Sequence, residues 1–184
     1  MTGVYTIPDL GPSDLTTTPR ENTRRFKVEE QLTSFAEGRQ FRAFYNTSIA
    51  NNQSFVVKVV APVNGILQNV SMVLHSGDVT LSTRAGGTEG GIFIEDVPTF
   101  PKNRQTTALP YTRQFVLSSG GTQTGGIEVD NVRLVVAGAT AQRQSVSTNI
   151  EERGVQPGVY YWVFTNASNA TADVNFSAWW GEYP

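Results

Sequence analysis

The sequence predicts an all-β protein: an antiparallel β-sandwich, jelly-roll-like, with an extended N-terminal arm. From about residue 39 onward, apolar residues recur with a period of two, which is the pattern of strands that turn one face to a core. Helical periodicity and strand–helix–strand units are nearly absent, which argues against the α/β classes. Charged residues make up only 16% of the chain, and a surface rich in Ser, Thr, Asn and Gln suits strands better than helices. An immunoglobulin-like strand order is the alternative within the same class.

Eight segments carry the strand pattern. They are 41–45, 55–61, 66–76, 78–84, 113–119, 127–137, 158–166 and 172–180, and a segment near Phe26 and Val28 is a candidate ninth. The segment 55-FVVKVVA-61 is apolar on both faces except for Lys58, which predicts a central strand with both faces covered. In the segment 127–137 the apolar residues change parity, which predicts a β-bulge near Asp130-Asn131.

Turn residues separate these segments. The dipeptide Asn51-Asn52 predicts a hairpin between the first two strands, because Asn tolerates positive φ. We expect another hairpin tip at 166–172, and flexible hairpin tips at the glycine-rich stretches 86–91 and 120–126. Neither glycine stretch continues into a Lys-Ser/Thr pair and a helix, which argues against a phosphate-binding loop. The proline-containing segment 96–111 is either a functional loop or a long crossover between two sheets.

The chain divides into an arm and one domain. Residues 1–34 form the predicted arm, and residues 35–184 form the sandwich domain. Prolines and a threonine run interrupt the arm, and the capping-box pattern Thr18-Pro19-Arg20-Glu21 predicts a short helical turn in it. The apolar side chains of the arm need a surface to anchor on, either on the same domain or on a neighbouring subunit. These interface candidates are Val4, Tyr5, Ile7, Leu10 and Leu15.

The charge pattern does not predict nucleic-acid binding. The net charge is −2 and no block of like charges occurs, whereas binding by counterion release needs Lys and Arg clustered on one face. The nearest candidate is 20-RENTRRFK-27, in which an acidic residue stands beside the basic ones. We expect a solvated segment of mixed charge there, and Arg24 and Arg25 are candidates for a protein interface.

The sequence contains no recognisable catalytic, metal-binding or cofactor-binding set. The absence of cysteine removes disulfides, thiolate metal sites and cysteine nucleophiles. The single histidine, His75, has no triad partners in reach on its own strand, and one histidine does not make an ordinary zinc site. The carboxylate pairs Glu95-Asp96 and Glu151-Glu152 are adjacent residues, whose side chains point to opposite faces of a strand. We therefore expect no enzyme activity, no cofactor and no metal.

The N-terminus lacks the basic start and the apolar run of a signal peptide, and no apolar stretch reaches the roughly 18 residues of a membrane span. We expect a soluble protein that is not exported and that does not contact a membrane. The matches to the glycosylation pattern are therefore expected to arise by chance. They are Asn46, Asn52, Asn69, Asn166, Asn169 and Asn175.

The last predicted strand ends on adjacent tryptophans, Trp179 and Trp180. Alternation places Trp180 on the apolar face of this strand, so we expect Trp180 in the core. Trp179 falls on the other face, with Asn175 and Ser177. An indole on a polar face needs cover, and aromatic residues are enriched at protein interfaces. The cover is either the N-terminal arm or another subunit, which makes Trp179 a further interface candidate.

Five strings occur in the last four-fifths of the chain: 37-EGRQFRAFYN-46, 62-PVNGILQ-68, 86-GGT-88, 158-GVYYWVFTN-166 and 179-WW-180. In these strings the chain resembles small structural proteins from the heads and tails of tailed bacteriophages. The resemblance implies a non-enzymatic virion protein with a β-sandwich body: a capsid decoration or cement protein that binds the head shell as a trimer and stabilises it. It implies the major capsid protein or other virion proteins as partners, and a place in the virion after assembly in the host cytoplasm. The strings reflect packing rather than chemistry, so the resemblance assigns no binding residues.

Three other functions remain as alternatives. A collar-associated, tail-associated or receptor-contact protein that binds carbohydrate would use Tyr160, Trp162 or Trp179 as a stacking platform. A hydrolase would need an acid–base pair in catalytic geometry, and none is evident. An adhesin or pilus subunit would normally carry an export signal.

Overall fold

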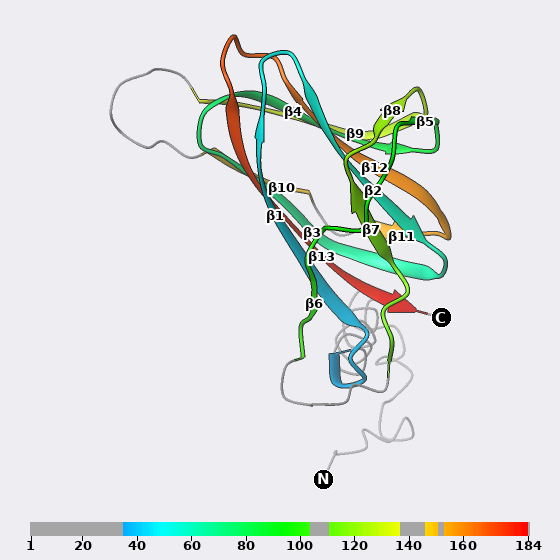
Figure 1. Ribbon diagram of the computed structural model, residues 1–184. Helices are drawn as coiled ribbons and strands as arrows, with labels where there is room; N and C mark the ends of the chain where they lie inside the picture. Colours follow the sequence, from blue (N-terminus) through cyan, green and yellow to red (C-terminus); the bar gives the residue numbers. More distant parts are fainter. Residues whose placement is uncertain (1–34, 104–110, 137–145, 151–152, 184) are drawn as a thin grey trace, which may run out of the picture.

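Two large antiparallel sheets pack face to face in the computed structural model of the chain (Figure 1). The structure describes residues 35–103, 111–136, 146–150 and 153–183, with the backbone alone for 146–150 and 153. Sheet A runs in the order β10 (Val146–Ile150), β3 (Asn64–Leu74), β13 (Ala172–Tyr183), β1 (Gln40–Ile49) and β6 (Thr99–Pro101), and β11 (Arg153–Val155) also pairs with β3. Sheet B runs in the order β7 (Val116–Ser119), β2 (Ser54–Ala61), β12 (Gly158–Asn166), β4 (Gly77–Ala85) and β9 (Ile127–Val136). A small third sheet pairs β5 (Thr88–Gly90) with β8 (Thr122–Thr124).

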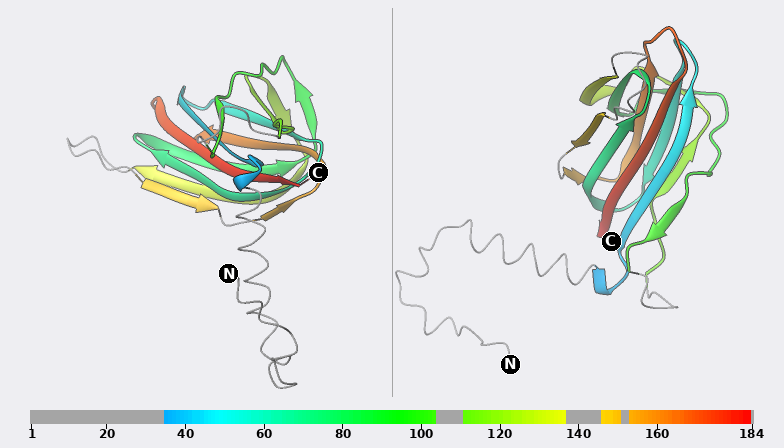
Figure 2. Two further views of the ribbon diagram at one scale, coloured as in Figure 1. Left: turned by 90° about the horizontal axis from the view of Figure 1, so that it is seen from below. Right: turned by 90° about the vertical axis from the view of Figure 1, so that its left-hand side faces the viewer.

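The pairing of the main strands is nested. β1 pairs with β13, β2 with β12, β3 with β10 and β4 with β9, so the first of these strands pairs with the last and each later strand with its counterpart. On either side of the β4–β9 pair, successive main strands alternate between the two sheets, which Figure 2 shows as two curved layers. A long antiparallel ribbon that is rolled up in this way is a jelly roll. The predicted fold class, an antiparallel β-sandwich of the jelly-roll type, is therefore confirmed.

All eight predicted segments are strands in the structure. They correspond to β1, β2, β3, β4, β7, β9, β12 and β13. The prediction missed β10, which belongs to the roll, and the short strands β5, β6, β8 and β11. Such short strands hold too few alternating positions to show a period of two, so their pairing partners specify them. The candidate ninth strand near Phe26 and Val28 lies outside the described residues, as do the predicted arm and its helical turn.

Two predicted hairpins are wrong. Asn52 does adopt the expected positive φ, at 54°, and the N–H of Gln53 donates to the carbonyl of Ala50 to close the turn. However, β1 belongs to sheet A and β2 to sheet B, so this turn crosses between the sheets. The turn at 166–172 likewise joins β12 of sheet B to β13 of sheet A. Turn residues specify that the chain reverses, whereas the rolled pairing decides which sheet the next strand enters.

One buried amide holds both of these turns at the same end of the sandwich. Asn166 is completely buried, and its Nδ2 donates to the carbonyls of Ile49, Ala50 and Ala170. Its Oδ1 accepts hydrogen bonds from the N–H and the hydroxyl of Ser168. Every polar atom of this amide is thus satisfied, as a buried polar group requires. The buried position also leaves Asn166 unavailable for a glycan.

The two glycine-rich stretches pair with each other. β5 and β8 form an antiparallel ladder, so the stretches are not separate flexible hairpin tips as predicted. We call residues 86–94 and 120–126 the flap. Gly121 allows the flap to close, because a Cβ at this position would lie 2.3 Å from the ring of Phe93. Figure 1 shows β5 and β8 at the upper right of the view, next to β12 and β2.

The core between the sheets is largely aromatic. Trp180 is 1% exposed and stacks on Phe41 and Phe115, with ring centres 5.9 and 6.2 Å away. Trp162 of sheet B packs against Phe176 of sheet A at 5.0 Å. Burial of side chains this large is a main source of folding free energy. The prediction that Trp180 belongs to the core is confirmed.

A β-bulge occurs on β9, close to the predicted position. Asp130 pairs with Thr83 and Glu128 pairs with Arg84, which leaves Val129 between them as the extra residue. The parity change in the sequence therefore predicted the bulge correctly to within one residue. The bulge turns the later apolar residues of β9 toward the core and leaves Val129 exposed.

A buried carboxylate fastens the end of β13 to the opposite sheet. Glu182 is fully buried, and its Oε2 accepts a hydrogen bond from the backbone N–H of Gln114 at 2.7 Å. Its Oε1 accepts from the N–H of Phe115 and from the indole Nε1–H of Trp180, both at 3.0 Å. Burying a carboxylate is costly unless N–H donors replace the lost water. Glu182 thereby ties β13 in sheet A to the segment that leads into β7 in sheet B.

Candidate functional site

The outer face of sheet A carries a line of large side chains at the end where β13 finishes. The pairing places Phe100 of β6 opposite Arg42 of β1. Arg42 in turn lies opposite Trp179 of β13, and Trp179 lies opposite Asn69 of β3. Because paired residues share a face, these side chains lie in one row across the sheet. Trp179 is 43% exposed, so its predicted outward orientation is confirmed.

A bulge on β3 adds a polar side chain next to this row. The partners of Trp179 and Trp180 on β3 are not adjacent, and Gln68 lies between them as the extra residue. Bulges commonly re-aim a side chain at a functional surface. Here the Oε1 of Gln68 accepts a hydrogen bond from the Nζ of Lys102 at 3.1 Å.

Lys102 covers part of Trp179. Its Nζ lies 5.0 Å from the centre of the indole, within the range of a cation–π interaction. Partial burial lowers the pKa of Lys102 from its ordinary value. The backbone N–H of Lys102 donates to the carbonyl of Gln40 at 2.8 Å, which fixes where the side chain starts. The lysine is thus held in place at both ends of its side chain.

A second aromatic pair extends the row. Phe44 of β1 stacks on Phe100 with ring centres 5.4 Å apart and ring planes 9° apart. Phe44 is 46% exposed. The side chains of Arg42, Phe44, Phe100, Lys102 and Trp179 therefore gather on one face, and we call them the aromatic–cationic cluster.

The rest of this outer face is mostly small and polar. The hydroxyls of Ser71 and Ser177 share a hydrogen bond at 3.2 Å. Asn46 and Asn175 are paired across β1 and β13, and both are exposed. The most exposed large apolar side chains of sheet A are therefore concentrated in the aromatic–cationic cluster.

The outer face of sheet B differs, because the flap covers the part of it around Tyr161 and Lys58. Tyr161 of β12 is only 2% exposed, and its hydroxyl donates to Oε1 of Glu89 in the flap. The Nζ of Lys58 on β2 lies 2.7 Å from the same oxygen and 5.4 Å from the ring centre of Phe93. Hydrogen bonds from Lys58 and Tyr161 lower the pKa of Glu89, and burial raises the pKa of Tyr161. The prediction that the strand 55–61 has both faces covered is confirmed.

Trp179 is the one sequence-predicted interface residue that falls in the described part of the chain. The others, Val4, Tyr5, Ile7, Leu10, Leu15, Arg24 and Arg25, lie outside the described residues. Sequence reasoning missed the other members of the cluster. Phe44 was detectable, because it interrupts the alternation of 41-FRAFY-45. Phe100 and Lys102 belong to a segment that the sequence predicts as a loop, and no pattern in it indicates that the segment pairs with β1.

We also searched the described residues for catalytic groups, metal ligands and membrane-spanning helices. His75 is exposed, and no group of three or more His, Cys, Asp or Glu side chains is placed there to hold a metal ion. Asp96 accepts hydrogen bonds from the N–H and hydroxyl of Ser119, and the adjacent Glu95 pairs instead with Arg113. Among the same residues, no helix is long and apolar enough to cross a membrane.

No protein-family model, curated protein or solved structure matches this chain.

Proposed function

We propose that this chain is a non-enzymatic virion structural protein: a capsid decoration or cement protein that binds the head shell through the aromatic–cationic cluster and stabilises the shell. The exposed cluster is the observation that carries the proposal. Trp, Phe and Arg are enriched in protein interfaces, and Trp and Arg dominate their binding hot spots. The jelly roll is compatible with this role, since viral capsid domains use it, but lectins and cupins use it too, so the fold alone does not choose.

The proposed partner is the major capsid protein or another virion protein. The cluster lies on a sheet, which presents its side chains on a rigid support. Arg42 and Lys102 place two cationic side chains beside the exposed rings, so the complementary surface carries carboxylates next to an apolar patch. Two cationic groups are too few for the basic stripe that nucleic acid requires, and we propose neither a nucleic-acid nor a membrane partner.

We further propose a homotrimer whose residues 1–34 reach across the boundary between neighbouring capsomers. An extended chain of this length spans up to roughly 110 Å, enough to tie two capsomers with little mass. The protein would assemble in the host cytoplasm and remain in the virion. Removal of residues 1–34 is expected to weaken particle binding, and unchanged binding would contradict the proposed role of the arm.

The central test is a pair of alanine variants with similar exposure. Trp179→Ala removes the ring at the centre of the cluster, whereas Val135→Ala removes an apolar side chain that is 49% exposed on β9 of the other sheet. We expect Trp179→Ala to abolish cosedimentation with capsids of the same virus, because the cluster is the proposed contact with the shell. Val135→Ala is expected to leave cosedimentation unchanged, and light scattering checks that both variants keep the native mass of the wild type.

Two results would overturn the proposal. A Trp179→Ala protein that binds capsids as tightly as the wild type would remove the cluster from the interface. A wild-type protein that stays monomeric and does not bind capsids would remove the structural role altogether.

A second candidate is a collar-associated, tail-associated or receptor-contact protein that binds carbohydrate. The observation in its favour is that Trp179 pairs with Asn69, whose amide supplies donors and acceptors beside an exposed ring. Trp162 is 4% exposed and packs in the core, so it does not serve as the stacking platform. A glycan array would favour this candidate if it shows binding by the wild type and none by Trp179→Ala.

A further inference from the structure

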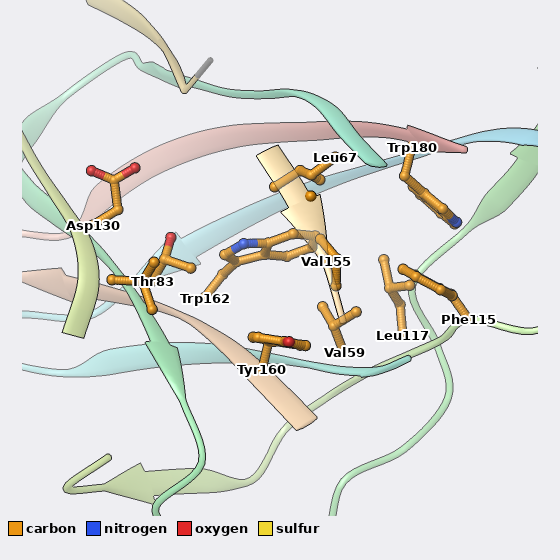
Figure 3. A pocket seen from close by; sticks show the side chains of 12 residues that line it. Val59, Leu67, Thr83, Phe115, Leu117, Asp130, Val155, Tyr160, Trp162 and Trp180 are labelled. Carbon is orange, nitrogen blue, oxygen red and sulfur yellow. The ribbon is translucent and has the colours of Figure 1, made fainter. Parts of the chain in front are cut away.

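A cavity of about 80 Å³ lies between the two sheets, at the end of the sandwich where β11 runs beside β3. Side chains from both sheets form its walls. They include Val59, Leu67, Leu117, Val155, Trp162 and Trp180. Figure 3 shows the indole of Trp162 lying across the cavity, with Thr83 on one side of the ring and Val155 on the other.

The cavity is apolar and it reaches the surface. Water finds few hydrogen-bond partners in an apolar cavity, so such cavities stay dry and accept apolar molecules. Val129 of β9 and Gly154 of β11 also line the cavity, and both are exposed. The gap between these two strands therefore gives a small molecule a route into the sandwich.

Two polar side chains line this otherwise apolar space, those of Thr83 and Asp130. The Oγ1 of Thr83 is buried and has no hydrogen-bond partner among the described residues. Thr83 follows Val79 and Leu81 on the inward face of β4, where an apolar residue would complete the pattern. A buried hydroxyl without a partner costs free energy, and a hydroxyl can rotate to donate or to accept. A ligand with one polar group would satisfy Thr83.

We propose that this cavity binds a small apolar molecule that carries one hydroxyl group, of about the size of phenol. A cavity of about 150 Å³ is known to hold benzene in a protein core. The present cavity is smaller but open between β9 and β11, so part of the ring lies in the opening while the hydroxyl reaches Thr83. This proposal stands apart from the virion role, because none of its residues belongs to the aromatic–cationic cluster.

The inward polar residues have a competing explanation. Strand β9 is at the edge of sheet B, and proteins protect such edges with bulges and with charged side chains that point inward. The bulge at Val129 and the inward-facing Asp130 fit that purpose. Thr83 would then protect the edge strand from pairing with another chain rather than bind a ligand. The two explanations differ in what they predict for phenol binding by Thr83→Val.

The experiment compares phenol with benzene on the full chain and on two variants. Thr83→Val keeps the shape of the side chain and removes its hydroxyl. Gly154→Leu places a bulky side chain at the opening, where an added Cβ meets no heavy atom within 4 Å. Binding is measured by titration calorimetry, and the three tryptophan indole N–H signals in NMR report the location. Circular dichroism confirms that each variant is folded.

For the wild type we expect phenol to bind more tightly than benzene and to shift the signals of Trp162 and Trp180 but not that of Trp179. Thr83→Val is expected to weaken phenol binding about fivefold, the worth of one neutral hydrogen bond, and to leave benzene binding unchanged. Gly154→Leu is expected to abolish binding of both. The proposal is overturned if neither molecule binds the wild type, if Gly154→Leu binds both normally, or if Thr83→Val leaves the phenol affinity unchanged. Self-association of Thr83→Val together with an unchanged phenol affinity would favour the protection of the edge strand.

Discussion

The outer faces of the two sheets are built from the same kind of strand, yet their aromatic side chains differ in how far they are exposed to solvent. On sheet B, the flap buries Tyr161, and Glu89 satisfies both Tyr161 and Lys58. On sheet A, Trp179 and Phe44 keep 43% and 46% of their surface exposed, and Lys102 shields only part of one indole. The chain supplies its own cover for one aromatic face and leaves the other aromatic face open.

This difference indicates what each face is for. An aromatic side chain that needs only to be protected can be covered by a short ladder such as β5–β8, at a cost of a few residues. Aromatic residues that remain exposed in a row, beside two cations, are typical of a surface that another molecule covers. The contrast between the two faces can therefore be tested residue by residue.

The largest effect is expected beneath the open face, at Trp180. Trp180→Ala removes a fully buried indole that stacks on Phe41 and Phe115 and that donates to Glu182. We expect a loss of about 3–5 kcal/mol in the free energy of unfolding, measured by urea denaturation. If Trp179→Ala and Trp180→Ala lost equal thermal stability with no change in oligomeric state, the two faces of β13 would not differ as described.

Glu182 connects the two sheets, so its loss is expected to weaken both. Glu182→Ala removes the acceptor of three N–H donors, two of them in buried hydrogen bonds, and should cost about 3 kcal/mol. Glu182→Gln is the matched control, because its amide oxygen still accepts from some of these donors, and it should cost less. The urea midpoints of the two variants are compared. Equal midpoints would show that the hydrogen bonds accepted by Glu182 do not stabilise the contact between the two sheets.

The flap makes a smaller contribution to the free energy of unfolding, and this contribution depends on pH. Lys58, and then Tyr161, hold the pKa of Glu89 below its ordinary value of 4.5, so the folded state gains stability above about pH 4.5 and loses it as pH falls through the lower folded pKa. Glu89→Gln should cost less than about 1 kcal/mol at pH 7, because the carboxylate is partly exposed to solvent. The difference between wild type and variant should shrink toward zero below pH 4.5 in thermal unfolding. A difference that grows on acidification would contradict this sign.

The smallest effect on folding is expected at the exposed ring itself. Trp179→Ala should change the free energy of unfolding by less than about 0.5 kcal/mol, as is usual for surface substitutions, while association with the partner is lost. Thermal unfolding and cosedimentation with capsids, measured on the same preparation, separate the two effects. A large drop in melting temperature without loss of association would mean that Trp179 serves the fold and not an interface.

Much of the fold can be predicted from the sequence, because the alternation of side chains along a strand is a local property. The period of two located eight strands, separated Trp179 from Trp180, and placed a bulge within one residue of Val129. Each of these features depends on which way neighbouring side chains point along one strand, which the backbone geometry determines. In the candidate site, strand alternation predicted the outward direction of Trp179, and it could also have predicted that of Phe44.

The tertiary structure alone decided which segments meet. The turn at Asn52 reverses the chain as predicted, yet it leads into the other sheet. Strand β10 is too short for its alternation of apolar and polar residues to be recognised in the sequence. Phe100 and Lys102 join the cluster because β6 pairs with β1 across more than fifty residues of sequence. Glu182 is buried because its three donors converge at the seam between the sheets. Contacts between distant segments are set by how the whole roll packs, and no local pattern in the sequence records that choice.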